Sequence, residues 1–270
     1  MIEIKAYAKV NLILNINGIY ENRHLLDSII SQIDIYDTIR LEKNTENIVE
    51  IKYINKDFCP NNDTAFKMAT LIKNNYNLSG VSISIIKNIP VGAGLGGSSA
   101  DAAGVAMGMQ KLFDLDVLPP QLLLQVGSDV PSMYLGGDVR IQGLGDKCTK
   151  VLLPKLYKII LLENEGVSTK ASYDLYDEVG GDNYSVDEFL KALFEKKAFF
   201  VNALEKASSL LNENIAKNKA LLLSCGFMSC MTGSGSAVVG YSYNKEDFIM
   251  GLNKLMKKDN SLKFILGQKE

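Results

Sequence analysis

A glycine-rich segment at residues 90–99 carries the residue types best suited to binding a phosphate. Its residues are Pro90, Val91, Gly92, Ala93, Gly94, Leu95, Gly96, Gly97, Ser98 and Ser99. A strand-like alternation at 81–86 precedes it, and small residues that favour a buried helix follow it. Glycines let successive backbone N–H groups converge on one point, and a helix N-terminus adds partial positive charge there. The order of strand, glycine loop and helix therefore predicts a phosphate-binding loop.

Two better-known nucleotide motifs do not describe this loop. No Lys-Ser or Lys-Thr pair follows its last glycine, so it is not a P-loop. Gly92, Gly94 and Gly97 fit the bare G-x-G-x-x-G spacing, but the acidic residue expected about 20 residues further on, at a strand end, is missing. The alternative is a tight turn before a packed helix. Four glycines and two serines at a strand-to-helix junction favour the phosphate site over that turn.

The composition is that of a globular chain without a nucleic-acid or membrane signature. A length of 270 residues holds one large domain or two modest ones, and an apolar content of 47% is enough for a core. A net charge of -2 argues against a broad basic field for nucleic acid. The apolar runs are too short to span a bilayer, and residues 1–5 lack the character of a signal peptide. We therefore expect a cytoplasmic protein with neither a nucleic acid nor a membrane as partner.

The cysteines and the single histidine do not suggest a metal centre. The cysteines are Cys59, Cys148, Cys225 and Cys230, and their spacing matches no zinc motif. Disulfides are rare in a reducing compartment, so we expect neutral thiols and no metal held by the protein alone.

Strands and helices are predicted in an order without strict alternation, which favours an α+β fold over a doubly wound sheet. Strands are predicted at 2–6, 10–16, 38–41, 48–53, 81–86, 138–142 and 157–162, and on both sides of 232–236. Helices are predicted at 65–76 (starting from residues 62–64), 99–113, 120–126, 169–178, 186–195, 200–212, 215–224 and 245–257. A helical or irregular piece is expected at 25–33 and a loop at 127–131. A linker at 149–155 predicts a division into domains 1–150 and 151–270.

Three motifs together resemble the GHMP kinase superfamily, named after galactokinase, homoserine kinase, mevalonate kinase and phosphomevalonate kinase. They are Ala-Lys-Val-Asn-Leu at 8–12, the loop at 90–103 and the second Gly/Ser loop at 231–237. They occur in the expected order and cover both halves of the chain. The resemblance implies a two-domain GHMP kinase fold, with a ribosomal-protein-S5-like N-terminal domain and a ferredoxin-like C-terminal domain.

Further segments resemble the superfamily's kinases of cytidyl sugar alcohols. They are the histidine segment 24–26, the aspartate loop 127–131, residues 167–169 with Tyr173, and residues 202–205. This resemblance implies an ATP-dependent kinase that phosphorylates the 2-hydroxyl of 4-diphosphocytidyl-2-C-methyl-D-erythritol, in the methylerythritol phosphate (non-mevalonate) route to isoprenoid and terpenoid precursors. It implies ATP with Mg²⁺ that rests on the phosphates and takes few protein ligands. The sequence leaves open whether the chain is a monomer or a homodimer.

The resemblance also assigns roles to individual residues. Asp129 would accept the hydroxyl proton as general base, and Lys9 would keep that carboxylate ionised and neutralise charge in the transition state. The residues assigned to ATP are Pro90, Gly92, Gly94, Leu95, Gly96, Gly97, Ser98 and Ser99. The residues assigned to the substrate are Asn11, Arg23, His24, Thr169, Tyr173, Gly233 and Ser234. Of these, His24 would hydrogen-bond cytosine and Tyr173 would stack on it. A turn-capping Asp129, a solvent-facing Lys9 and a core Tyr173 are the alternatives.

Two departures from the family pattern bear on the substrate. Arg23 stands where the family has a tyrosine that stacks on cytosine, although a guanidinium can also stack on a base. Two glycines, where the family more often has three, precede Ser98 and Ser99, which leaves the role of Asp101 open. Another GHMP kinase, or the related diphosphomevalonate decarboxylase, is the alternative enzyme. A phosphate-ligand binder without activity is the third reading, and the presence of both Lys9 and Asp129 argues against it.

Overall fold

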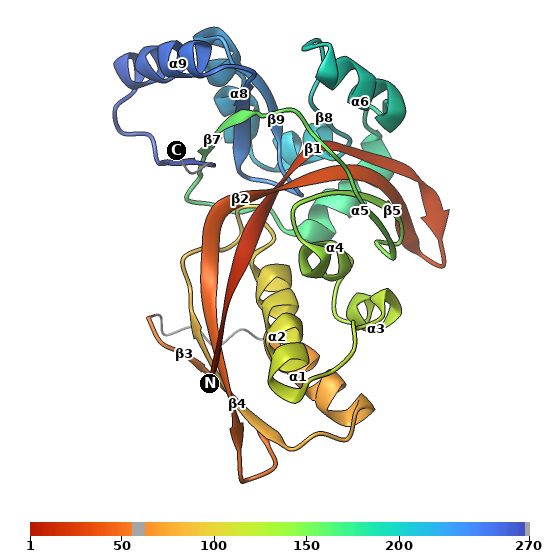
Figure 1. The fold of residues 1–270 in the computed structure, drawn as a ribbon. Coiled ribbons are helices and arrows are strands. Elements are labelled where there is room, and N and C mark those ends of the chain that lie inside the picture. The colour runs from red at the N-terminus through yellow and green to blue at the C-terminus, as the bar shows by residue number, and fades with distance from the viewer. Residues whose placement is uncertain (56–62, 268–270) are drawn as a thin grey trace.

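The computed structural model describes residues 1–55 and 63–267. They form an elongated molecule with two sheets, one above the other along its length, and helices packed on them (Figure 1). Within these residues a seven-stranded sheet has the order β3-β4-β2-β1-β8, with β5 on β2 and β6 on β5, and a four-stranded sheet has the order β11-β7-β10-β9. The strands are β1 (Ile2–Tyr20), β2 (Arg23–Asn44), β3 (Val49–Tyr53), β4 (Gly80–Ile86), β5 (Asp138–Gly143), β6 (Lys147–Lys150), β7 (Tyr157–Leu161), β8 (Val201–Asn202), β9 (Met228–Met231), β10 (Val238–Ser242) and β11 (Phe264–Leu266). The helices are α1 (Thr64–Asn75), α2 (Gly97–Phe113), α3 (Pro120–Leu124), α4 (Val130–Leu135), α5 (Thr169–Val179), α6 (Val186–Phe194), α7 (Glu205–Leu211), α8 (Asn214–Cys225) and α9 (Lys245–Lys258). The mixture confirms the predicted α+β class.

The first two strands differ most from the prediction. The expected separate strands at 2–6 and 10–16 are one continuous strand, β1, which pairs antiparallel with β2 from Ile2 to Tyr20. The helical or irregular segment expected at 25–33 is wrong, because these residues belong to β2. Residues 28–31 are buried on both faces of the sheet, so their side chains show no polar alternation.

Helix α2 is held against β1 and β2 by its small residues. A Cβ at Gly104 would lie 2.5 Å from Ile39 Cδ1, and one at Gly108 would lie 2.2 Å from Leu41 Cδ1. Only glycine lets the helix backbone approach the sheet this closely. The helix begins at Gly97, two residues before the predicted start, after Gly96 in the left-handed conformation. This packing aims the helix N-terminus at the end of β4 and at the middle of β1.

Several other predicted boundaries differ from the structure because short helices and strands lie there. Residues 130–135 form helix α4, so the loop predicted at 127–131 ends at Asp129, which stands at the N-cap position of this helix without a capping hydrogen bond from its side chain. The helix predicted at 200–212 begins only at Glu205, since Val201 and Asn202 form β8 beside β1. The linker predicted at 149–155 starts inside β6. The predicted helix start at Asp63 is confirmed, because its carboxylate caps α1, while residue 62 lies outside the described part of the chain. The division at residue 150 stays a prediction.

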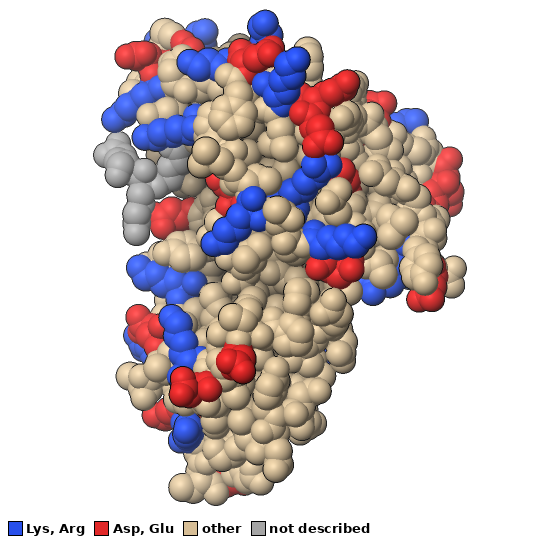
Figure 2. All heavy atoms as spheres, turned by 45° about the vertical axis from the view of Figure 1, so that its right-hand side comes forward, with Lys and Arg blue, Asp and Glu red and all other residues tan. Residues whose placement is uncertain are grey.

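The four-stranded sheet and the helices that pack on it lie at the upper end of Figure 1. Helices α8 and α9 pack on the four-stranded sheet, with α8 against β9 and β10. The cysteines that the structure describes, Cys148, Cys225 and Cys230, carry free thiols, and Cys59 lies outside the described residues. No helix within the described ranges is long and apolar enough to cross a bilayer. Charges of both signs are interspersed over the upper part and the left edge of the face drawn in Figure 2, and few lie on its lower right.

A buried charged cluster anchors the start of the glycine loop. The Lys87 ammonium donates to Asp37 on β2 and to Asp101 Oδ2 on α2, at 2.5 Å for the latter. Asp37 Oδ1 also accepts from the backbone N–H groups of Asn88 and Ile89, at 2.5 and 2.8 Å. All three charged residues are at most 4% exposed, and Asp101 Oδ1 has no partner in the described structure. The Lys87 ammonium therefore joins β2 to α2, and the Asp37 carboxylate joins β2 to the start of the loop.

The cluster predicts a dependence of stability on pH. Burial raises the pKa of Asp101 to about 8, since desolvation outweighs the attraction of Lys87 and the carboxylate of Asp37 repels a second negative charge. In the unfolded chain an aspartate titrates near pH 4, so between about pH 4 and 8 only the folded state holds this proton. We therefore expect the free energy of unfolding to fall as pH rises through that window, with no further loss from Asp101 above it.

Urea unfolding at a series of pH values tests this expectation. Asp101→Asn removes the titrating group, so the fall between pH 4 and 8 should become shallower than in the wild type. Asp116→Asn is the matched control, because Asp116 is exposed. Equal slopes for wild type and Asp101→Asn would show that Asp101 is ionised in the folded protein.

Candidate active site

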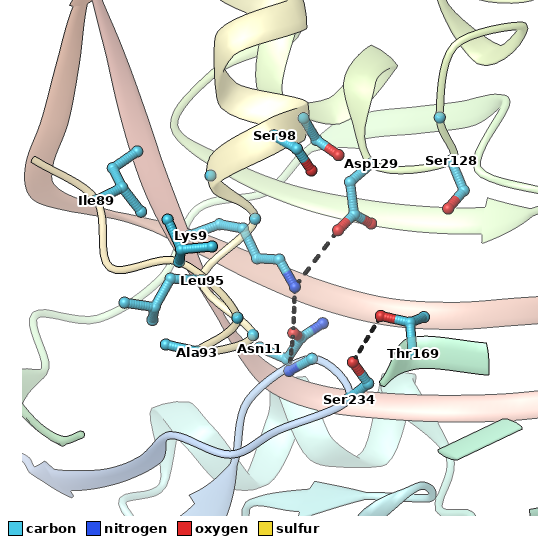
Figure 3. A pocket seen from close by; sticks show the side chains of 18 of the residues that line it. Lys9, Asn11, Ile89, Ala93, Leu95, Ser98, Ser128, Asp129, Thr169 and Ser234 are labelled. Atoms are coloured by element: carbon cyan, nitrogen blue, oxygen red, sulfur yellow. Dashed lines mark hydrogen bonds and ion pairs between the residues drawn. The ribbon is translucent and has the colours of Figure 1, made fainter. Parts of the chain in front are cut away.

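A cavity of about 350 Å³ lies where the two Gly/Ser loops meet β1, α2, α4 and α5 (Figure 3). The predicted site residues that line it are Lys9, Asn11, Pro90, Gly92, Gly94, Leu95, Gly96, Gly97, Ser98, Ser99, Asp129, Thr169, Tyr173, Gly233 and Ser234. Arg23 and His24 do not line it. The structure thus brings residues from both halves of the chain into one pocket.

Lys9 and Asp129 face one another inside this pocket. Lys9 lies on β1 with 3% of its surface exposed, and its Nζ is 3.5 Å from Asp129 Oδ2. The same ammonium donates to Asn11 Oδ1 at 2.8 Å. Its stem passes over the glycine loop, where a Cβ at Gly96 would lie 3.2 Å from Lys9 Cε. A buried ammonium in this position can stabilise negative charge brought into the pocket.

Asn11 connects the lysine to the second Gly/Ser loop. Its Oδ1 accepts from Lys9 Nζ, from the Gly233 backbone N–H at 2.9 Å and from Thr232 Oγ1 at 3.3 Å. Its Nδ2 donates to Ser28 Oγ at 3.0 Å. The carboxamide therefore orients the Lys9 ammonium and holds the second loop, and one amide hydrogen stays available for a ligand.

The two Gly/Ser loops touch through their backbones. Ala237 N–H donates to Ala93 O at 3.2 Å, and a Cβ at Gly94 would lie 2.2 Å from Thr232 O. Gly94 has a φ of +75°, a region that favours glycine. Gly94 is thus required for the contact between the loops in addition to any role in holding a phosphate.

Side chains of the second half brace the second loop from behind. Asn202 Nδ2 donates to the carbonyls of Met231 and Gly233, at 3.0 and 2.8 Å. Thr169 Oγ1, at the start of α5, lies 2.9 Å from Ser234 Oγ (Figure 3). In that view Ser98, Ser128 and Asp129 line one side of the pocket, and the Thr169–Ser234 pair lies on the other.

Other lining residues were not assigned a role in catalysis, ATP binding or substrate binding from the sequence. They are Leu14, Leu26, Ser28, Tyr53, Thr64, Lys87, Asp101, Ser128, Ile141 and Leu204, among others. Lys87 and Asp101 flank the glycine loop, so the charges beside an apolar strand and within a small-residue helix were the available signals. Ser128 and Leu204 lie in segments that resemble those of the family, whereas Tyr53 carried no signal, because a distant segment brings it to the pocket.

His24 and Arg23 lie beside the pocket, at the turn between β1 and β2. The His24 ring packs on the ring of Tyr173, with centroids 4.6 Å apart, and Tyr173 itself lines the pocket. His24 Nε2 lies 2.7 Å from Asp177 Oδ1 on α5. Burial raises the pKa of the Tyr173 phenol well above its ordinary value, so the ring stays neutral. Arg23 is exposed.

Nothing in the described ranges gathers three or more His, Cys, Asp or Glu side chains as a metal site. Asp129 and the hydroxyls of Ser98 and Ser99 are among the oxygen donors that line the pocket near the phosphate loop. That set suits a divalent ion carried mainly by phosphate oxygens rather than a metal held by the protein alone.

A match to a family model also indicates the class of protein. A model described as the GHMP kinases N terminal domain matches residues 63–144, which run from α1 through the glycine loop and past Asp129. The fold and the site, with two Gly/Ser loops around one lysine–aspartate pair, define a GHMP kinase.

Individual relatives narrow the class. The chain is 36% identical to the 4-diphosphocytidyl-2-C-methyl-D-erythritol kinase of Clostridium botulinum (strain Alaska E43 / Type E3), over 88% of this chain and 90% of the relative. It is 32% identical to the enzyme of that name from Clostridium tetani (strain Massachusetts / E88), over 96% and 98% of the two chains. A crystal structure of 4-(cytidine 5'-diphospho)-2C-methyl-D-erythritol kinase superposes with a TM-score of 0.81 at 26% identity, covering 98% of each chain. The chain belongs to the family of 4-diphosphocytidyl-2-C-methyl-D-erythritol kinases, and the predicted family, fold and enzyme class are confirmed.

Proposed function

We propose that the chain transfers the γ-phosphoryl group of ATP to the 2-hydroxyl of 4-diphosphocytidyl-2-C-methyl-D-erythritol, a step of isoprenoid precursor biosynthesis. Identity of 36% over 88% of the chain to a kinase of this name supports the substrate over the alternative GHMP acceptors. The observation that carries the chemistry is the buried Lys9 ammonium 3.5 Å from the Asp129 carboxylate, at the junction of the two loops.

Asp129 acts as the general base in this proposal. Its carboxylate has 29% of its side-chain surface exposed, so it can reach a ligand in the pocket while one oxygen faces Lys9. An alcohol proton must leave as the oxygen bonds to phosphorus, and a carboxylate within hydrogen-bond reach accepts it. Lys9 lies 3.5 Å from Asp129 Oδ2 and offsets the negative charge of the phosphoryl group. Asn11 fixes where that ammonium points.

The first glycine loop holds the triphosphate in this proposal. Gly97 and Ser98 open α2, where free backbone N–H groups and the helix dipole favour an anion. Ser98 and Ser99 add hydroxyl donors on the same turn. Mg²⁺ bound to the nucleotide would neutralise charge on the transferred phosphoryl group, with Ser98, Ser99 and Asp129 as the oxygen donors at hand.

The substrate lies on the other side, against the second loop and α5. Asn11, Gly233, Ser234 and Thr169 surround the end nearest Asp129. Tyr173 offers an uncharged ring for the cytosine, with His24 beside it. Arg23 lies next to His24 in the chain, and in our proposal its guanidinium stacks on the base where relatives of the family have tyrosine.

Turnover with a panel of acceptors tests the proposal. ADP release would be followed with ATP and magnesium, and with the cytidyl substrate, mevalonate, phosphomevalonate or homoserine as acceptor. We expect kcat/KM for the cytidyl substrate to exceed that of each other acceptor by about 10³-fold or more, because polar contacts to a base are lost with acceptors that lack one. Turnover with another acceptor would overturn the substrate while leaving the kinase chemistry standing. Tight ATP binding without turnover on any acceptor would point to a binding protein.

A further inference from the structure

We infer that Asp177 is a positioning residue that fixes the proton of His24 on Nε2, and thereby sets a preference for cytosine over uracil. The contact that carries this is the 2.7 Å distance between His24 Nε2 and Asp177 Oδ1. The inference rests on the proposed function, because it concerns how the cytidyl end of that substrate is recognised.

The chemistry of the pair leaves one arrangement for the neutral ring. An ionised carboxylate only accepts hydrogen bonds, so the imidazole nitrogen that faces it must donate. In the neutral imidazole the other nitrogen, Nδ1, then carries a lone pair and only accepts. Within the described residues Nδ1 has no hydrogen-bond partner, so this acceptor is available to a ligand.

The surroundings hold the ring in place for that task. His24 is the second residue of β2 and lies opposite Ile19 of β1, and its side chain is 16% exposed. Tyr173 lies against one face at 4.6 Å between centroids, and Tyr176 meets the ring edge-on at 6.2 Å. Tyr173, Tyr176 and Asp177 all lie on α5, and about one turn separates the first from the last. A single helix therefore supplies both the ring contacts and the carboxylate that accepts the hydrogen bond from Nε2. A base bound beside Tyr173 lies within reach of the His24 ring.

A lone pair on Nδ1 distinguishes the two pyrimidines. Cytosine presents an amino group at position 4, which donates a hydrogen bond, whereas uracil presents a carbonyl oxygen there. The amino group satisfies the acceptor, and the carbonyl places two lone pairs against one another, which leaves both unpaired. Moving the proton to Nδ1 would reverse this preference.

Asp177→Lys makes that reversal testable. Lysine is a donor without a lone pair, so at this position it would donate to Nε2 and drive the proton to Nδ1. Asp177 is 45% exposed in its side chain, so the helix accommodates the change. Asp174→Lys is the matched control, with the same change of charge on the same helix at a residue that pairs with Lys170 instead.

Two measurements separate the inference from the proposed function. His24 is the only histidine of the chain, so nitrogen-15 NMR of the imidazole reports its tautomer without assignment. We expect the Nε2–H form in wild type and Asp174→Lys, and the Nδ1–H form in Asp177→Lys. The second measurement is binding of cytidine 5'-diphosphate and uridine 5'-diphosphate by calorimetry, which needs no turnover.

We expect the ratio of the two Kd values to favour cytidine in wild type, and to shift by at least about tenfold toward uridine in Asp177→Lys but not in Asp174→Lys. With the full cytidyl substrate, KM should rise while kcat changes little, since Asp177 lies about two turns along α5 from Thr169, the α5 residue at the reacting end. A doubly protonated ring or an Nδ1–H ring in the wild type would overturn the inference, and so would an unchanged Kd ratio in Asp177→Lys. Failure of wild type to phosphorylate the cytidyl substrate would overturn the proposed function, and the tautomer and the Kd ratio would still decide the role of Asp177.

Discussion

Asp129→Asn should lower kcat by about 10³-fold or more while ATP binds with nearly unchanged affinity. A general base contributes about 10²- to 10⁴-fold, and the amide cannot take the alcohol proton. The variant should fold normally. The contacts that organise the start of α4 use the backbone carbonyl of Asp129, which accepts from Ser132 Oγ at 2.8 Å and from the Met133 N–H at 3.1 Å. Single-turnover kinetics with ATP and the cytidyl substrate would measure the loss, and calorimetry with an unreactive ATP analogue would measure binding.

Lys9→Met provides the companion measurement for the same pair. If Lys9 acts mainly by orienting the Asp129 carboxylate, the double variant Lys9→Met/Asp129→Asn should be only slightly slower than Asp129→Asn alone. The reason is that the effects of substituting residues that act as a unit are not additive. Retention of more than a tenth of the wild-type kcat in Asp129→Asn would remove this aspartate from proton transfer. The role of Asp129 would then be to balance the charge of the buried Lys9 ammonium.

Gly94→Ala should disrupt the junction of the two Gly/Ser loops. The new Cβ would lie 2.2 Å from Thr232 O, so one backbone must move away from the other. The residue would also be held at a φ of +75°. Together, overpacking and left-handed strain should lower the free energy of unfolding by about 3–5 kcal/mol. The displaced loop should lower kcat/KM by about 10²-fold in the fraction that folds.

Gly92→Ala is the control that isolates the contact between the loops. Gly92 has nearly the same φ, +72°, but a Cβ there would meet only Gly166 Cα at 3.7 Å, an ordinary contact. Urea unfolding should therefore show a loss of about 1–2 kcal/mol for this variant, the cost of the left-handed conformation alone. Equal losses for the two variants would mean that the loops separate freely and that the backbone contact contributes nothing.

Local patterns were sufficient for the elements that the chain builds from neighbours. The capping aspartate of α1, the helix after the glycine loop and the strands on either side of residues 232–236 follow from sequence signals within one turn or one hairpin. The two longest strands do not. Residues 28–31 of β2 are buried on both faces, and β1 has register shifts near Lys9 and near Asn11, so neither shows a clean period of two.

The candidate site shows the same division. The residue types of the loop at 90–99, and of Lys9, Asn11 and Asp129, were recognised from motifs, and the structure brings them to one pocket. Their partners were hidden, because Asp177 lies 153 residues from His24, and Thr232 lies 221 residues from Asn11. A contact across such a distance in the chain leaves no periodic trace in either segment.

By itself, the sequence determined which residues carry the chemistry: an anion-binding loop before a helix, a lysine in an apolar strand and an aspartate in a Gly-Ser-Asp turn. The tertiary structure alone decided what each of them faces. Lys9 on β1 meets Asp129 at the start of α4 because both elements pack against α2, and Gly94 meets Thr232 because no side chain keeps the two backbones apart. The physical reason is that residue type depends on local chemistry, whereas the distance between two side chains depends on the packing of every element between them.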